Sequence, residues 1–204
     1  MPHIVKHPYS AVGHLASHDF REPGDGVKRK NENIDPERTR LNGFRRWNSD
    51  VEEINAFEGT PKQRARQFLQ KRVDDAREAT AKKAGRKCRA NTVVLCEWVV
   101  TLPPQIDRND TKKAVEFFSR CFQFAAKRYG MENVPLCAEH FDETTPHCHI
   151  MVIPMVDGKL NAKKLINRRE LSTFHGDLSA YLEANGLPGV SAQPKEDPLE
   201  EAER

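Results

Sequence analysis

The spacing of apolar positions along the chain predicts alternating strands and helices. Residues 92–101 are almost continuously apolar, which indicates a central strand covered on both faces. Between Asp110, which offers an N-cap, and Gly130, apolar residues recur at helical spacing over 112–129. Further helices are expected at 11–20, 62–84 and 170–184, and further strands around 4–5, at 134–141 and at 148–154.

The order of these elements is strand, helix, helix, strand, helix, strand, strand, helix. It predicts an α/β fold of the α+β sandwich type, in which helices flank an antiparallel central sheet. With 204 residues, the chain has room for one well-buried domain, expected over 1–190. Residues 24–33 are expected to form a polar, mobile loop. Residues 191–204 are polar and acidic, and we expect a disordered tail or the start of a further segment.

A histidine-rich segment lies between the last two predicted strands, where three of the chain's eight histidines fall within residues 140–149. His147 and His149 are two residues apart, so on a strand both project from one face and Cys148 from the other. A turn at 144–146 would bring His140 back beside them. A His-x-His pair alone is more often packed or hydrogen-bonded. Three imidazoles with open coordination positions are typical of a catalytic metal site.

Charge and cysteine content narrow the class of protein. The formal net charge is +3, but basic residues are in excess over 1–90 and acidic residues over 91–204. A basic half beside a metal site indicates a polyanionic binding partner such as nucleic acid. The alternative is that these basic residues form an ordinary solvated surface. The five cysteines show no Cys-x-x-Cys spacing, so no disulfide framework or thiolate zinc cluster is indicated. Without a membrane-length apolar run or a signal-peptide pattern, a soluble cytoplasmic protein is expected.

The sequence resembles the Mob/Pre plasmid-mobilisation relaxases, the MobV group of the His-hydrophobe-His endonucleases. The resemblance is carried by three blocks, at 13–21 with 33–42, at 93–101 and at 140–160. It extends over residues 1–190, which correspond to the catalytic domain of such proteins. It implies a relaxase-like fold and a site-specific endonuclease and ligase, which nicks one DNA strand at a plasmid transfer origin during conjugative mobilisation.

The resemblance also implies a role for each matching residue. His140, His147 and His149 would hold a divalent metal ion, and Glu143 or its neighbour Asp142 would orient an imidazole or take its proton. Three imidazoles favour zinc, nickel or cobalt by softness. The family is associated with manganese or magnesium, so Mn²⁺ is expected, with Mg²⁺ as the alternative. His18 lines up with the group's nucleophile and would form a 5′-phosphohistidine adduct.

Several alternatives stay open at this point. His14, one helical turn before His18, and Tyr9 are rival nucleophiles, whereas Tyr129 and Tyr181 are expected to be structural. A metal nuclease that activates water, or a DNA-binding autoregulator of the origin with a structural metal, would also fit. The expected partners are single-stranded and hairpin DNA of a transfer origin and a conjugation coupling protein, in an oligomeric state that the sequence does not give. The residues expected to contact DNA phosphates are Arg21, Arg38, Arg40, Arg86 and Arg89.

Overall fold

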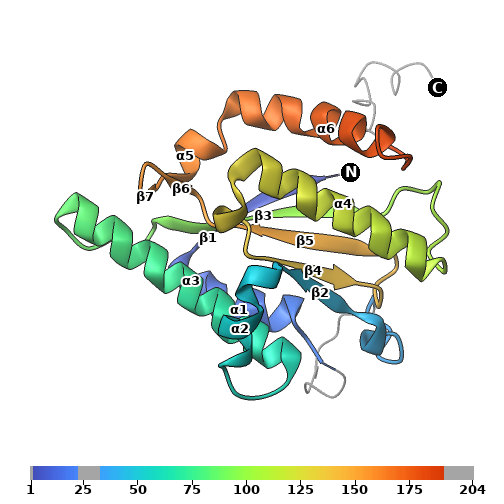
Figure 1. The fold of residues 1–204 in the computed structure, drawn as a ribbon, viewed down its shortest axis with the longest axis horizontal. Helices are drawn as coiled ribbons and strands as arrows, with labels where there is room; N and C mark the ends of the chain where they lie inside the picture. The colour runs from blue at the N-terminus through green and yellow to red at the C-terminus, as the bar shows by residue number, and fades with distance from the viewer. Residues whose placement is uncertain (1, 23–32, 191–204) are drawn as a thin grey trace, which may run out of the picture.

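A five-stranded antiparallel sheet forms the centre of the molecule. The structure is a computed structural model that describes residues 2–22 and 33–190. The strand order is β1-β3-β5-β4-β2 (Figure 1). The strands are β1 (His3–Pro8), β2 (Gly43–Arg46), β3 (Val93–Thr101), β4 (Leu136–His140) and β5 (His147–Val152). The predicted α/β fold with an antiparallel central sheet is confirmed.

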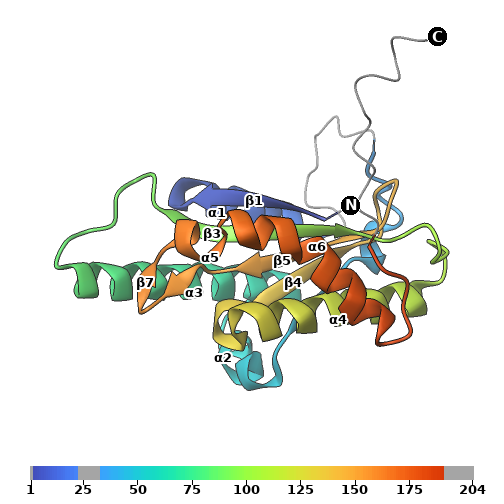
Figure 2. The same cartoon turned by 90° about the horizontal axis from the view of Figure 1, so that it is seen from above.

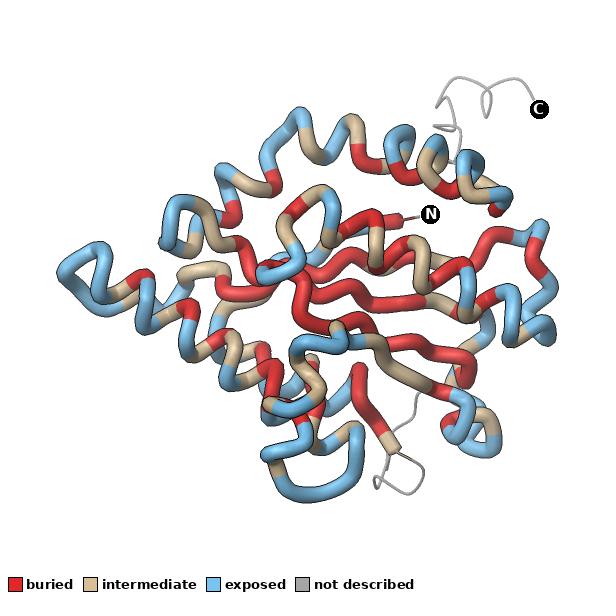
Figure 3. Tube along the Cα trace, in the orientation of Figure 1, coloured by how far each residue is buried: buried red, intermediate tan, exposed pale blue. Residues whose placement is uncertain are grey.

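Helices cover both faces of this sheet and enclose two cores (Figures 1 and 2). One face carries α1 (Tyr9–Asp19), α2 (Val51–Asn55) and α3 (Pro61–Ala84), and the other carries α4 (Thr111–Tyr129) and α6 (Arg168–Glu183). In the core on the side of α4 and α6, the Trp98 ring stacks on Phe174 with ring centroids 3.5 Å apart. Burial is concentrated on the strands and on the inner sides of the helices (Figure 3). β3 is therefore covered on both faces, as its nearly continuous apolar sequence predicts.

Short elements connect these layers. They are the 3-10 helices η1 (Thr39–Leu41), η2 (Asn48–Asp50) and η3 (Met131–Asn133), the helix α5 (Ala162–Leu165) and the strands β6 (Met155–Val156) and β7 (Lys159–Leu160). β6 and β7 form a hairpin. Its two turn residues, Asp157 and Gly158, have φ values of 52° and 69°, and two-residue hairpin turns require this conformation.

The four longer helices lie within two residues of their predicted positions. α3 begins with a capping box between Thr60 and Gln63 and ends at Gly85, whose φ is 65°. α4 begins after Asp110, whose Oδ1 accepts a hydrogen bond from the Lys113 backbone N–H at 3.0 Å. The strand expected at 148–154 is shifted, because β5 starts at His147 and ends at Val152. Both histidines of the pair therefore lie within the strand.

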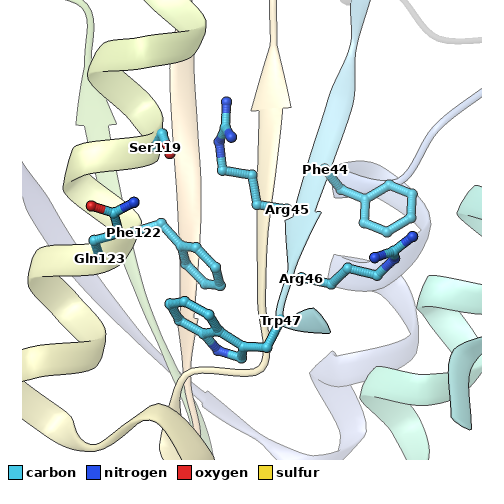
Figure 4. A pocket seen from close by; sticks show the side chains of 7 residues that line it. All are labelled: Phe44, Arg45, Arg46, Trp47, Ser119, Phe122 and Gln123. Atoms are coloured by element: carbon cyan, nitrogen blue, oxygen red, sulfur yellow. The ribbon is translucent and has the colours of Figure 1, made fainter. Parts of the chain in front are cut away.

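The edge strand β2 is missing from the predicted order of elements. It has four residues, two of them arginine, and no apolar alternation marks it. Contacts far away in the sequence hold it: Arg45 donates hydrogen bonds to Glu139 and to the Val115 carbonyl. Trp47, directly after the strand, stacks on Phe122 of α4 with ring centroids 4.3 Å apart (Figure 4). Tertiary contacts, rather than local pattern, therefore specify this strand.

Two predicted segments cannot be compared with the structure. The polar loop at 24–33 lies, apart from Asn33, outside the described residues, and the tail at 191–204 lies outside them entirely. The division of the chain at residue 190 stays a prediction. All five cysteines are free thiols. In the described part of the chain, no helix combines the length and apolarity needed to cross a membrane.

Candidate metal centre

Three histidines meet where β4 ends and β5 begins. These strands are joined by the turn at 141–146, and their register pairs His140 with His147. His147 and His149 share the face that carries α1, while Cys148 is buried in the core on the opposite face. The ring centroids of the three histidines lie 4.6 to 5.1 Å apart. The short turn thus brings together the residues that the sequence singles out as metal ligands.

In both His140 and His149, a hydrogen bond engages one ring nitrogen and leaves the second ring nitrogen without a hydrogen bond to the described residues. His140 Nε2 donates to the backbone oxygen of Asp19 at 2.9 Å. His149 Nδ1 donates to Glu97 Oε1 at 2.6 Å. The lone pairs therefore lie on His140 Nδ1 and His149 Nε2. Both of these atoms are buried and have no hydrogen-bond partner among the described residues. Unpartnered buried nitrogens fit a metal ion, because polar atoms are rarely buried without a partner.

His147 and Glu143 lie on the open side of the cluster. His147 Nδ1 donates to the Thr145 carbonyl at 2.9 Å, which leaves its lone pair on Nε2. Glu143 Oε1 is 3.7 Å from His140 Nδ1 and 4.0 Å from His147 Nε2. The ligand atoms of His140, Glu143 and His147 all lie within 4.8 Å of one another. The carboxylate is thus placed to share an ion with the histidines.

Burial keeps these imidazoles neutral. It lowers the pKa of His140 well below its ordinary value, and the neighbouring charges of His149 and Arg21 lower it further. The pKa of His147 is also lowered, by burial first and then by His149. Neutral imidazole is the form that binds a metal ion, so His140 and His147 are ready for coordination near neutral pH.

His18 stands beside this cluster, at the C-terminal end of α1. Its ring centroid is 5.5 Å from that of His140 and 5.9 Å from that of His149. Its Nδ1 donates to Asp19 Oδ1 at 2.9 Å, so its lone pair lies on Nε2. The side chain is 42% exposed, whereas His140 is fully buried. Burial, followed by the charge of Arg21, lowers the pKa of His18. A neutral and accessible imidazole therefore faces the candidate metal site.

Two buried carboxylates behind the histidines are absent from the sequence prediction. Glu97 accepts hydrogen bonds from His149 and, at 3.1 Å, from His7 Nε2. Burial alone would raise the pKa of Glu97, but these hydrogen bonds bring it below its ordinary value. Burial raises the pKa of Asp19 well above its ordinary value, and the nearby His149 partly counteracts this rise. A sequence signal exists for Glu97, because it is the single charged residue within the apolar segment 93–101.

Arg21 is buried beside the cluster, with its side chain 4% exposed. Its guanidinium donates to both carboxylate oxygens of Asp142 and, at 2.9 Å, to Glu143 Oε1. Thr39 Oγ1 also donates to Asp142, at 2.9 Å. Arg21 thus holds Glu143 in place and ties α1 to the turn after β4. Its predicted contact with a DNA phosphate stays a prediction, and its guanidinium is already engaged within the protein.

The other arginines expected to contact DNA lie at two places. Arg38 directly precedes η1 and Arg40 lies within it; Arg38 Nε donates to the Phe141 carbonyl at 2.9 Å, and Arg40 is exposed. Arg86 and Arg89 are exposed in the segment between α3 and β3. This segment enters β3 at Val93, whereas the histidines pair with the other end of that strand. The structure therefore places Arg38 and Arg40 near the cluster and Arg86 and Arg89 far from it.

The rival nucleophiles lie farther from the cluster than His18. His14 is exposed one turn earlier on α1, about 6 Å along the helix axis. Tyr9 begins α1, about 13 Å along the axis from His18, and lies beneath the Arg77 guanidinium at 3.7 Å. Tyr129 and Tyr181 belong to the core on the opposite face of the sheet. Of these candidates, the structure brings only His18 into ring contact with His140 and His149.

A hollow of about 370 Å³ opens beside the cluster. Glu143 and His147 form one part of its wall, and Asn33, Thr144 and Thr145 contribute polar groups to the rest. Solvent and a ligand can therefore reach the side of the cluster where His147 and Glu143 lie.

Comparison with protein families gives one match over nearly the whole chain. The family model Mob_Pre, described as plasmid recombination enzyme, matches residues 1–191. A plasmid recombination enzyme of Streptococcus agalactiae is 29% identical over 158 residues, which are 77% of this chain and 29% of that protein. One of Lactiplantibacillus plantarum is 36% identical over 111 residues, 52% of this chain and 30% of that protein. The chain spans about a third of the length of the curated relatives that it matches.

Solved structures with the same fold include the MobM relaxase domain bound to origin-of-transfer DNA of plasmid pMV158. A manganese-bound crystal structure of that domain at pH 6.8 superposes with a TM-score of 0.72 and 22% sequence identity, over 100% of this chain and 98% of that chain. A second manganese-bound crystal structure, at pH 4.6, gives the same TM-score with 24% identity. At these identities the likeness shows the fold.

Proposed function

Because the chain belongs to the plasmid recombination enzyme family, we propose that it is the catalytic domain of a metal-dependent DNA relaxase. In this proposal it cuts one DNA strand at a transfer origin and holds the new 5′ end on His18. The observation that carries the proposal is the buried histidine cluster, in which two nitrogen atoms have no hydrogen-bond partner within residues 2–22 and 33–190, beside a half-exposed histidine. Such an arrangement offers both a cation site and an accessible nucleophile.

His140, His147 and His149 are the proposed ligands of the divalent ion, and Glu143 is proposed to complete their set. Mn²⁺ is the proposed ion, in line with the manganese-bound MobM crystals, and Mg²⁺ is the alternative. When bound, the ion supplies positive charge that polarises the scissile phosphate and stabilises the charge that develops on it. Glu97 holds the ring of His149 from behind, and Arg21 holds Glu143.

His18 is the proposed nucleophile. Its lowered pKa keeps the ring neutral at neutral pH, so the lone pair on Nε2 is free to react. Nε2 attacks the phosphorus, and an N–P bond forms while the bond from phosphorus to the 3′ oxygen breaks. The leaving oxygen takes a proton from solvent and becomes a free 3′-hydroxyl. The ring keeps its Nδ1–H, and its hydrogen bond to Asp19 Oδ1 stabilises the positive charge that the ring acquires.

The product is a 5′-phosphohistidine with an activated phosphorus–nitrogen bond. The 3′-hydroxyl can attack this phosphorus in reverse, which reseals the strand and returns neutral His18 without ATP. The covalent step therefore conserves the energy of the broken phosphodiester, as a strand transferase requires.

Single-stranded DNA is the proposed substrate at the cluster, with a hairpin of the origin next to it. Arg38, which donates to the Phe141 carbonyl next to His140, and Arg40, two residues further on, are proposed to contact phosphates of the bound strand. A conjugation coupling protein as a partner and a cytoplasmic location follow from this role and stay predictions.

A second function competes with this proposal, namely a metal nuclease that activates water. It is favoured by the grouping of His18 with His140 and His149, whose ligand atoms lie within 4.8 Å of one another. In that arrangement His18 would be a further metal ligand, and no covalent adduct would form. The autoregulator alternative predicts DNA binding without cleavage.

The test is an adduct assay on single-stranded oligonucleotides that carry a randomised segment and a 3′ label. Wild type with Mn²⁺ should give a labelled, acid-labile protein–DNA band, and EDTA should abolish it. His18→Ala should lose the band, whereas His14→Ala and Tyr9→Phe should keep it. Cleavage without a band in wild type would support the water-activating nuclease. Binding with neither cleavage nor a band would support the autoregulator.

A further inference from the structure

A groove of about 400 Å³ lies between the edge strand β2 and the helix α4 (Figure 4). Residues 44–47 form its strand side. Ser119, Phe122 and Gln123 form its helix side, and their spacing of three and four positions places them on one face of α4. None of the lining residues is acidic. We call this hollow the β2–α4 groove.

The strand that borders this groove has an unpaired outer edge. β2 is the last strand of the sheet, and among the described residues β4 is its one partner. Apart from that ladder, no hydrogen bond within residues 2–22 and 33–190 uses a backbone group of residues 43–46. The N–H and C=O groups of a strand edge can pair with another extended chain. A groove between such an edge and a helix therefore suits an extended peptide, which would join the sheet as a further strand.

The side chains of β2 divide between the two faces of the sheet. Arg45 and Trp47 lie on the face of α4, where Arg45 donates to the Val115 carbonyl and Trp47 stacks on Phe122 (Figure 4). Because side chains alternate along a strand, Arg46 lies on the opposite face. A peptide paired with β2 would alternate in the same way, so it would meet a different environment on each face.

Cationic side chains border the groove on both of its sides. Arg46 is exposed on the strand. On the helix, Arg120 Nη1 donates to Gln123 Oε1 at 3.1 Å, which places its guanidinium at the rim. Neither arginine forms a salt bridge with a carboxylate in the part of the chain that the structure describes, whereas Arg45 is already paired with Glu139. Arg46 and Arg120 are therefore available to carboxylates of a ligand.

We propose that the β2–α4 groove binds an extended acidic peptide of a partner protein, which pairs with the outer edge of β2. Every second side chain of the peptide lies on the face of Arg46, where a carboxylate makes an opposite-charge cross-strand pair. The intervening side chains enter the groove against the rings of Trp47 and Phe122. β2 has four residues and a length of about 13 Å, so about four residues of the peptide make these contacts.

Two other ligands suit the groove less well. A second copy of this chain would place two β2 strands edge to edge, where their arginines would repel each other. Single-stranded DNA would be attracted by the arginines, but it binds by stacking its bases on aromatic rings and has no groups in register with a strand edge. The rings here stack on each other, and Trp47 Nε1 donates to the Val134 carbonyl at 2.8 Å. A peptide alone satisfies both the edge and the charge.

The test is a subtractive selection from a phage-displayed library of random octapeptides. The library is first depleted on the Ser119→Trp variant, whose new ring fills the groove from the helix side, and then selected on the wild-type 204-residue chain. Enriched peptides are synthesised, labelled and titrated by fluorescence anisotropy. Arg46→Glu reverses the charge beside the outer edge of β2. Arg169→Glu reverses an exposed charge on α6 and is the matched control.

The enriched peptides should alternate acidic with apolar residues and lack proline, because proline cannot donate to a strand ladder. Arg46→Glu should weaken their binding about 10-fold, since it replaces an opposite-charge cross-strand pair with a like-charge pair. Arg169→Glu should bind them as wild type does. Bound peptide should also slow the hydrogen exchange of backbone amides in β2, because strand pairing protects them.

Three results would overturn the proposal: no enrichment, equal affinity of the enriched peptides for Arg46→Glu and wild type, or unchanged hydrogen exchange in β2. Displacement of the peptides by an equal concentration of oligothymidylate would assign the groove to single-stranded DNA instead.

Peptide binding in the groove does not depend on the reaction at the metal centre. Arg46→Glu should form the covalent adduct with single-stranded DNA at the wild-type rate. A wild type that binds the peptides but forms no adduct would refute the relaxase proposal alone. A wild type that forms the adduct but yields no enriched peptide would refute the groove proposal alone.

Discussion

The buried ion pair between Arg21 and Asp142 makes a quantitative prediction about stability. The Arg21 side chain is 4% exposed and that of Asp142 is 0% exposed. Asp142→Asn keeps the size of the side chain but leaves the guanidinium buried without its main counter-charge. Breaking a buried pair from one side costs about 3–5 kcal/mol. Glu143, which also contacts Arg21, is 21% exposed and compensates in part, so we expect a loss near the lower limit, about 3 kcal/mol.

Urea unfolding followed by tryptophan fluorescence measures this loss, and Arg21→Met completes a double-mutant cycle. Each single substitution leaves the other residue buried without its counter-charge. The double substitution should therefore lower the free energy of unfolding much less than the sum of the two single losses. Asp177→Asn is the control, because Asp177 pairs with Arg128 at 2.8 Å but is 52% exposed, and such a surface pair contributes at most about 1 kcal/mol. A loss below about 1 kcal/mol for Asp142→Asn, or losses that add to within about 0.5 kcal/mol, would show that the two side chains do not form a strongly coupled buried pair.

Four further outcomes follow from the same contacts. Burial alone would raise the pKa of Asp142, but Arg21 brings it below its ordinary value. The difference in unfolding free energy between wild type and Asp142→Asn should therefore stay constant above the unfolded-state pKa of about 3.9 and shrink as the pH falls below it. Urea titrations at decreasing pH measure this difference. Glu97→Gln should weaken Mn²⁺ binding about 10- to 100-fold in calorimetric titrations, because Glu97 orients the His149 ring; an unchanged Kd would contradict this. Mn²⁺ at about 100 times its Kd should add about 2.7 kcal/mol to the free energy of unfolding, and His149→Ala should abolish the gain. Phe174→Ala should cost about 3–5 kcal/mol, because its ring stacks on Trp98 in the other core, yet leave the Kd for Mn²⁺ unchanged.

The sequence predicts those parts of the molecule that short-range rules govern. α4 follows from apolar spacing and from the cap at Asp110, both local features. The approach of His140 to His147 follows from a short turn between two strands, which fixes their register. β2 obeys no such rule, because Arg45 is held by Glu139 and Val115, and Trp47 after the strand by Phe122, all far along the chain.

The support that Glu97 gives to His149, and the role of Arg21 as a buried ion-pair partner, escaped prediction for the same reason. Glu97 meets His149 across 52 positions of sequence, and Arg21 meets Asp142 across 121. An arginine that contacts phosphate and one that is buried against a carboxylate look alike in a sequence. Only the fold distinguishes Arg21, which is enclosed, from Arg86 and Arg89, which are exposed.

Mass spectrometry of the covalent adduct identifies the nucleophile most directly. The adduct formed with Mn²⁺ and single-stranded DNA would be trimmed with nuclease under non-acidic conditions, digested with protease and sequenced by tandem fragmentation. We expect a nucleotide mass on His18, joined by an acid-labile phosphorus–nitrogen bond. A nucleotide on His14 or on Tyr9, or DNA cleavage without any modified residue, would contradict it.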